Sequence, residues 1–182
     1  MIVPLRARSD YAFLDGLISP AQLAQAAAQQ GMPTLGLADH SGLTGAIEFY
    51  ESCRAFGLRP LLGLEVGVRL PDSIASSLTP TSQSHLVLLA MDLAGWANLC
   101  RLSSFLLCAS AGSQERWLDF EPLAEANRGL ICLTGGARGP LASLLRQGAH
   151  QAAEDLAARL RDSFPGRLYA EIQMHSPTDA AW

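Results

Sequence analysis

Short runs of apolar residues recur along the chain, separated by segments in which apolar and polar residues follow a helical period. Each run is five to nine residues long, a length typical of a buried β-strand and too short for most helices. The run at 60–68 is apolar on successive residues, as in a parallel strand covered on both faces. The pattern predicts strands at 1–8, 34–39, 60–68, 85–91, 130–134 and 168–173.

The segments between these runs have the spacing of amphipathic helices. Ser19 begins the first helix with a capping-box pattern, because Pro20 suits the first helical position and Gln22 can return a hydrogen bond. Strands that alternate with helices predict an α/β fold with a mostly parallel sheet. We expect a loop at 71–84 and helices at 20–30, 43–56, 94–109, 120–126, 140–147 and 149–163.

The stretch 35–45 ends a predicted buried strand in two polar residues, Asp39 and His40, which a glycine-bracketed turn follows. In α/β proteins the carboxyl ends of strands carry metal-binding and catalytic side chains, so this pair is a candidate site. The alternative is an ordinary strand end, in which Asp39 caps the next helix and His40 faces solvent. One Asp-His pair does not decide between them.

Other ionisable residues lie on or beside the predicted strands, and Glu65 even interrupts the apolar run at 60–68. His, Asp and Glu side chains that converge at one sheet edge can bind divalent metals, and two metals about 4 Å apart support phosphoester hydrolysis. Each residue taken alone also fits a structural role, since buried polar groups are usually satisfied by hydrogen bonds. The set is Arg6, Arg8, Asp15, His40, Glu65, His85, Glu171 and His175.

Composition narrows the class of protein. With 182 residues, 49% hydrophobic and 16% charged, the chain can form one domain, residues 1–182, with a substantial core. Its net charge of −4 argues against autonomous DNA binding, which needs a basic surface. No apolar run is long enough to span a membrane, and the charged start does not resemble a signal peptide. We therefore expect a cytoplasmic protein.

Several motifs resemble a known family in the right order over nearly the whole chain. The sequence is similar to the PHP (polymerase and histidinol phosphatase) domain at the N-terminus of bacterial DNA polymerase III alpha subunits. The motifs that carry the resemblance are LRARSDYAFLDG at 5–16, ADHSGLTGAIEFY at 38–50, PLLGLEV at 60–66, HLVLLA at 85–90, GLICLTGG at 129–136 and YAEIQMH at 169–175.

The resemblance implies a distorted (βα)7 TIM-like barrel with a metal cluster at its C-terminal rim. The family's closing Asp-x-His pair would lie beyond Trp182, so we expect a degenerate and truncated PHP domain whose barrel is incomplete at the C-terminus. We interpret Glu171 and His175 as structural or rim residues. Asp15, His40, Glu65 and His85 match the family's metal ligands, whereas Arg6, Arg8 and Gly136 stand where the family has ligands.

The functional hypothesis depends on Arg6 and Arg8. A guanidinium repels a cation and can replace its charge among carboxylates. We therefore expect Arg6 or Arg8 to pair with Asp15 or Glu65, with no catalytic residues and no cofactor, and with Zn or Mn bound only if the remnant ligands still form a site.

Three functions remain open. The first is a non-catalytic structural or interaction domain in DNA replication, whose partners are the remainder of a polymerase chain or other replication proteins. The alternative is an active metal-dependent phosphoesterase, such as a 3′–5′ exonuclease or a pyrophosphatase. A third possibility is a short stand-alone protein that uses the fold for binding. A barrel without its last strands also exposes a sheet edge, which favours a homodimer through that edge.

Overall fold

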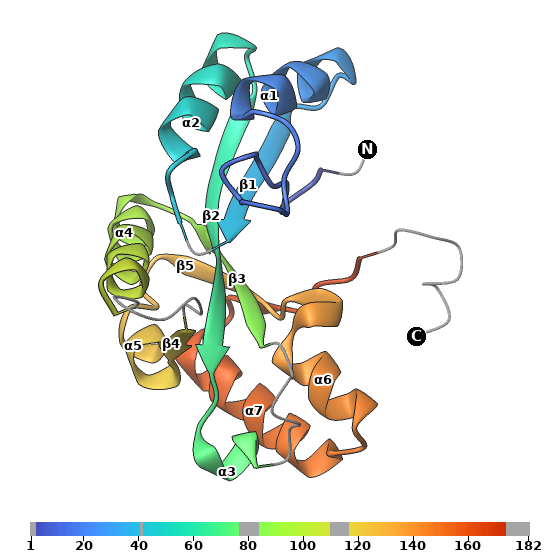
Figure 1. The fold of residues 1–182 in the computed structure, drawn as a ribbon, viewed down its shortest axis with the longest axis vertical. Coiled ribbons are helices and arrows are strands. Elements are labelled where there is room, and N and C mark those ends of the chain that lie inside the picture. The colour runs from blue at the N-terminus through green and yellow to red at the C-terminus, as the bar shows by residue number, and fades with distance from the viewer. Residues whose placement is uncertain (1–2, 41, 77–83, 110–116, 174–182) are drawn as a thin grey trace.

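The fold is built along one long strand, β2 (Arg59–Arg69), which runs through the middle of the molecule (Figure 1). The computed structural model describes residues 3–40, 42–76, 84–109 and 117–173. β2 pairs in parallel with β1 (Thr34–His40) and β4 (Trp117–Asp119) along one edge. Along the other edge it pairs antiparallel with β3 (His85–Ala90). The sheet continues through β5 (Leu130–Leu133) to β6 (Leu168–Tyr169), which confirms the α/β class.

The expectation of a mostly parallel sheet is confirmed for the described strands, since the β1–β2, β2–β4 and β5–β6 pairs are parallel. The exception is β3, which is antiparallel to both of its neighbours, β2 and β5. Parallel neighbours need a crossover connection, which is usually a long helix. In its described part, the segment between β2 and β3 holds only the four-residue helix α3 (Asp72–Ala75). A short connection of this kind suits antiparallel strands.

The predicted first strand is wrong in part. In the described part of 1–8, the chain runs beside β1 but forms only one isolated bridge, between Ala7 and Leu37. Pro4 has no backbone N–H to donate to a ladder. Gly36 permits residues 4–8 to approach β1 closely, because a Cβ at position 36 would lie only 2.4 Å from the carbonyl oxygen of Leu5.

The helices agree with the predicted ranges to within three residues at each end. They are α1 (Pro20–Gln29), α2 (Ala46–Ala55), α4 (Leu93–Ala109), α5 (Phe120–Glu125), α6 (Pro140–Arg146) and α7 (His150–Ser163), with a 3-10 turn η1 (Gly136–Arg138) after β5. The capping box at Ser19 and Gln22 is present at α1. The short strand β4 was not predicted, and β6 covers only the first two residues of the expected range 168–173. None of the described helices is both long and apolar enough to cross a membrane.

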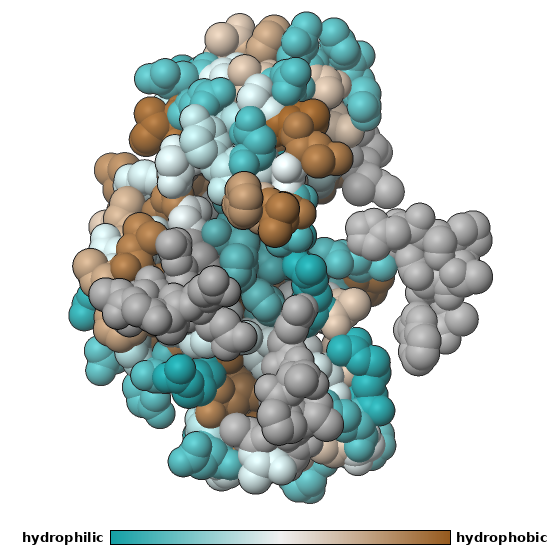
Figure 2. All heavy atoms as spheres, in the orientation of Figure 1, coloured by the Kyte–Doolittle hydropathy of each residue, from teal (hydrophilic) through white to brown (hydrophobic). Residues whose placement is uncertain are grey.

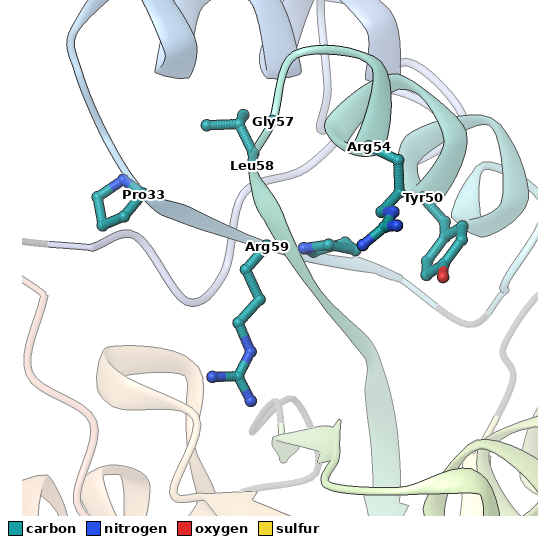
Figure 3. A pocket seen from close by; sticks show the side chains of 7 residues that line it. Pro33, Tyr50, Arg54, Gly57, Leu58 and Arg59 are labelled. Atoms are coloured by element: carbon teal, nitrogen blue, oxygen red, sulfur yellow. The ribbon is translucent and has the colours of Figure 1, made fainter.

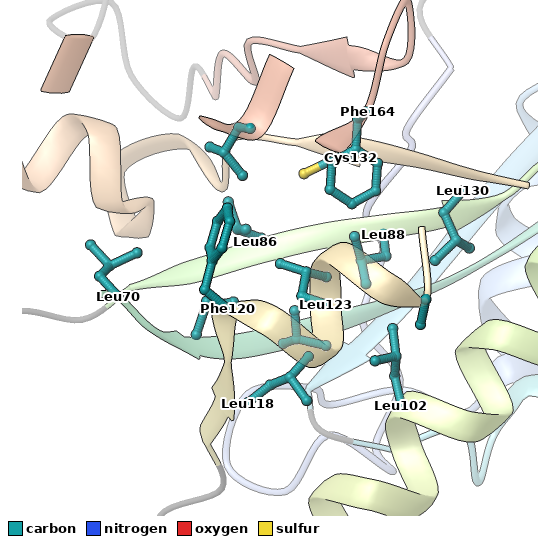
Figure 4. Close-up of a cluster of buried hydrophobic side chains, with 14 of the residues drawn as sticks. Leu70, Leu86, Leu88, Leu102, Leu118, Phe120, Leu123, Leu130, Cys132 and Phe164 are labelled. Carbon is teal, nitrogen blue, oxygen red and sulfur yellow. The ribbon is translucent and has the colours of Figure 1, made fainter. Parts of the chain in front are cut away.

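Two apolar cores lie between the helices and one face of the sheet, since Leu62 of the smaller core and Leu64 of the larger core project from the same face of β2. In the smaller core, α1 and α2 pack on β1 through residues such as Leu37, Phe49 and Cys53. The larger core lies where α4, α5, α6 and α7 meet β2, β3 and β5, and Figure 4 shows Leu88 and Leu123 among its side chains. The two cores fix the helices on the strands, and the strands in turn position the polar residues at their ends.

Leu88 tests the larger core, since its side chain is fully buried on the central part of β3. We expect Leu88→Ala to lower the free energy of unfolding by about 2–5 kcal/mol, because it removes apolar contacts and leaves a cavity. Leu93→Ala is the control, since Leu93 is 86% exposed and should change stability by no more than about 0.5 kcal/mol. Urea unfolding followed by circular dichroism measures both, and equal losses would contradict this description of the core.

Candidate functional site

The candidate site lies where β1 ends, on the sheet face opposite the larger core. His40 is the last residue of β1 and pairs in register with Glu65 on β2. His85 begins β3 and pairs with Gly67, two residues beyond Glu65. Because strand side chains alternate between faces, His40, Glu65 and His85 all project from the same face. On the same face, further along the strands, lies a small apolar cluster of Ala38, Val87, Leu89 and Leu133.

Two arginines bind a single oxygen of the fully buried Glu65 carboxylate. Nη2 of Arg6 lies 2.7 Å and Nη2 of Arg8 lies 2.6 Å from Oε2 of Glu65, and the Nε atoms of both arginines donate to the same oxygen. Burial alone would raise the pKa of Glu65, but the hydrogen bonds and charges of the arginines outweigh it and lower the pKa. Glu65 is therefore ionised, and the expected arginine–carboxylate pairing is confirmed.

Arg6 also joins the two edges of the sheet. Its Nη1 lies 3.0 Å from Oε1 of Glu171, which follows the edge strand β6, and donates to the carbonyl oxygen of Gly135 after β5. Gln173 donates to the same oxygen of Glu171. Arg6 itself precedes the bridge that binds residues 4–8 to β1. The buried guanidinium of Arg6 thus connects the two edges of a sheet that is open among the described strands.

A second, more exposed layer covers this buried pair. Asp15 lies in the loop before α1, and its Oδ2 is 3.6 Å from Nη1 of Arg8 and 3.5 Å from Nη1 of Arg138. The Asp15 side chain is 30% exposed and that of Arg138 43%. Figure 2 shows hydrophilic residues gathered near the centre of the view, with hydrophobic residues directly above them. Asp15 therefore faces two guanidinium groups but makes only long contacts with them.

The two histidines lie beside the other oxygen of Glu65. Nδ1 of His85 is 3.4 Å from Oε1 of Glu65, and neither atom has a hydrogen-bond partner among the described residues. The ring centroids of His40 and His85 are 5.0 Å apart. Burial lowers the pKa of His85 to about 4 and also lowers that of His40, despite the opposing charge of Glu65. Both imidazoles are neutral near pH 7.

Asp39 does not cap the following helix, although its position before the turn suggested this. Its carboxylate accepts hydrogen bonds from the backbone N–H and the hydroxyl of Ser9, at 2.7 and 2.6 Å. Burial raises the pKa of Asp39, and the bonds from Ser9 oppose this rise. Asp39 thereby fixes the segment that carries Arg6 and Arg8 against the end of β1.

The residues present do not fit the metal cluster that the family resemblance implies. Arg6, Arg8 and Gly136 offer no ligand, and one oxygen of Glu65 is already bound by two cations. In the part of the chain that the structure describes, the side chains able to hold an ion together are His40, Glu65 and His85, whose donor atoms lie within 4.8 Å of one another. Three possible metal ligands therefore remain, and they lie beside the permanent positive charges of Arg6 and Arg8.

The structure brings the described site residues expected from the sequence to this one place. Gly136 opens η1 with a φ of +56° and faces the side chain of Gln173. His175 lies outside the described residues. Sequence reasoning missed Arg138, and a signal was available, because the Gly135-Gly136 turn directly follows a buried strand and places the next residues at the same edge. It also missed the hydrogen bonds from Ser9.

A separate hollow of about 590 Å³ lies at the opposite ends of β1 and β2, between Pro33, Tyr50, Arg54 and Arg59. In Figure 3 the side chain of Arg59 extends away from the other labelled residues, and its guanidinium group lies apart from that of Arg54. Its cations do not converge on one point, unlike those around Glu65. Among the described residues, the charged groups that converge lie at the Glu65 end.

One solved structure supports the fold. An amidohydrolase from Chromobacterium violaceum superposes with a TM-score of 0.53 at 16% sequence identity, covering 96% of this chain and 88% of its own. At that identity the similarity concerns the fold alone.

Sequence comparisons identify the family. A model described as the PHP domain matches residues 4–175. DNA polymerase III subunit alpha of Caulobacter vibrioides is 36% identical over 98% of this chain, and that of Escherichia coli K12 is 34% identical over 93%. The chain spans only 16% and 14% of the lengths of these two relatives. The chain belongs to the PHP domain family and is homologous to the N-terminal domain of the DNA polymerase III alpha subunit.

Proposed function

We propose that this PHP domain is non-catalytic and serves as a structural or interaction domain in bacterial DNA replication. The observation that carries the proposal is the pairing of Arg6 and Arg8 with one oxygen of Glu65. In a metal-dependent phosphoesterase this carboxylate would bind the ion that activates water. Here two permanent cations take that place, and an arginine supplies neither a Lewis acid nor a bound hydroxide.

The proposed partner is the rest of a polymerase chain or another replication protein, in the cytoplasm. The relatives are polymerase subunits in which the matching region is 14–16% of the length, so a domain of this kind has a large neighbour to support. A homodimer through the sheet edge stays a prediction.

An active phosphoesterase is the second candidate, and one observation favours it. The donor atoms of His40, Glu65 and His85 lie within 4.8 Å of one another, and Oε1 of Glu65 and Nδ1 of His85 have no hydrogen-bond partner among the described residues. Such a set resembles the three protein ligands of a catalytic zinc site. The adjacent guanidinium groups oppose it, because they repel a divalent cation at close range.

Metal content separates the two candidates. We expect protein incubated with zinc or manganese and then desalted to retain less than about a tenth of an equivalent, because a functional site would hold about one. Inductively coupled plasma mass spectrometry measures the retained ion. One equivalent or more that is lost in His40→Ala would contradict the proposal, and nuclease and phosphatase assays would then be the next step.

The structural role of the arginines predicts a large effect of Arg6→Met on stability. The change leaves Glu65 and Glu171 buried with less compensation, and breaking a buried ion pair costs about 3–5 kcal/mol. Arg69→Met is a matched control, since Arg69 pairs with Asp119 on the surface, where the side chains are 65% and 49% exposed, and such pairs contribute at most about 1 kcal/mol. Chemical unfolding compares the two. A loss for Arg6→Met no larger than that of the control would refute the structural role.

A further inference from the structure

The hollow at the starts of β1 and β2, far along the strands from Glu65, carries uncompensated positive charge. Its lining includes Arg54 and Arg59 and no acidic residue. Both arginines are exposed, and neither side chain makes an ion pair or a hydrogen bond with another residue that the structure describes. The hollow is therefore cationic, although the whole chain has a net charge of −4.

The backbone around the hollow is fixed before any ligand arrives. The N–H of Arg59 donates to the carbonyl oxygen of Pro33, at 2.9 Å, and Thr34 pairs in register with Arg59 at the start of the two strands. Pro33 and Pro60 restrict the chain further, because the ring of proline locks φ. Leu58 is buried in the smaller core. A surface on so rigid a backbone lowers the conformational cost of binding.

Tyr50 adds an aromatic surface to the lining of the hollow. It is 45% exposed and lies four residues before Arg54 on α2, so the two side chains project from the same side of that helix. Tyrosine and arginine are among the residue types that carry most of the binding energy at protein interfaces. The hollow thus combines apolar contact area with donors for charged hydrogen bonds.

The separation of the two guanidinium groups indicates the shape of the ligand. Arg54 comes from α2 and Arg59 from β2, and Figure 3 shows the two groups apart. Cationic donors that do not converge suit anionic groups at separate positions along a chain better than one small anion, which bidentate or convergent donors bind best. An extended acidic peptide has carboxylates at such positions, and arginine clusters commonly recognise acidic motifs.

A single-stranded nucleic acid also carries repeated negative charges, but it suits this surface less well. Its binding depends on neutralising successive phosphates along a basic groove. The hollow supplies only two arginines, and the chain as a whole has 17 acidic and 13 basic residues. A short acidic peptide needs only a few local contacts, so it is the ligand that the charges favour.

We propose that the hollow lined by Tyr50, Arg54 and Arg59 binds an extended acidic segment of a partner protein. Carboxylates of that segment pair with the two arginines, and an apolar residue between them packs on the ring of Tyr50. The inference rests on the interaction role in the proposed function, because it gives that role a surface and a class of partner. The surface is separate from the buried ion pairs of Glu65, which keep their structural role whether or not a partner binds.

Fluorescence anisotropy of a fluorescein-labelled peptide, DEDPLDED, titrated with the 182-residue protein in EDTA and at low salt tests the site. We expect a Kd of about 0.1 mM, and binding at least about tenfold weaker for the neutral peptide NQNPLNQN, which keeps the length and the apolar residues. Arg54→Gln and Arg59→Gln should each weaken binding of the acidic peptide at least about fivefold, because each removes one charged contact. Arg59→Lys keeps the charge and should stay within about threefold of the unchanged protein.

Arg159→Gln is the matched control, since Arg159 is exposed on α7 and its side chain also has no partner among the described residues; it should bind the peptide as the unchanged protein does. Equal binding of the two peptides, or binding that is unchanged in Arg54→Gln and Arg59→Gln, would overturn the site. Tighter binding of oligothymidylate than of the acidic peptide, weakened by the same variants, would assign the hollow to nucleic acid and overturn the proposal. Because EDTA removes metals, each result is independent of the metal content that tests the non-catalytic role.

Discussion

The ionised carboxylate of Glu65 is the constraint on which this end of the structure depends. It is fully buried on the central strand, and removing a carboxylate from water costs several kcal/mol unless opposite charge and hydrogen bonds compensate. A metal ion can supply that compensation, and so can a guanidinium. In this chain Arg6 and Arg8 supply it from a segment that is not itself a regular strand. The need to compensate this buried charge therefore positions residues 6–8 beside the sheet.

The same interaction links the two edges of an open sheet. Residues 4–8 lie beside β1 at one edge and Glu171 follows β6 at the other, and Arg6 contacts both Glu65 and Glu171. In the described residues the strands form an open path from β1 to β6, so no ladder of hydrogen bonds joins these edges. A side-chain ion pair makes the connection that backbone pairing does not. The stability of the fold and the chemistry of the site are thus coupled through one guanidinium.

The sequence predicted the helices well because their caps and periodicity are local signals, as at Ser19 and Gln22. It also predicted which side chains meet, since a buried strand with a polar end places Glu65, His40 and His85 at one edge. The direction of β3 and the short strand β4 could not be predicted, because they depend on which strand becomes the neighbour. The long-range contacts of Arg138 and Glu171 were not predicted, since they depend on how far the sheet curves.

Arginine at positions 6 and 8 is not equivalent to a simple loss of ligands. A neutral residue at either position would leave Glu65 buried with a smaller counter-charge, which protonation of the carboxyl or binding of a metal ion would have to offset. Arginine removes that need, because its charge is permanent and it binds carboxylates through several nitrogens. It also places permanent positive charge beside the donor atoms of His40, Glu65 and His85. The two arginines therefore stabilise the buried carboxylate and oppose the binding of a cation at this end of the sheet.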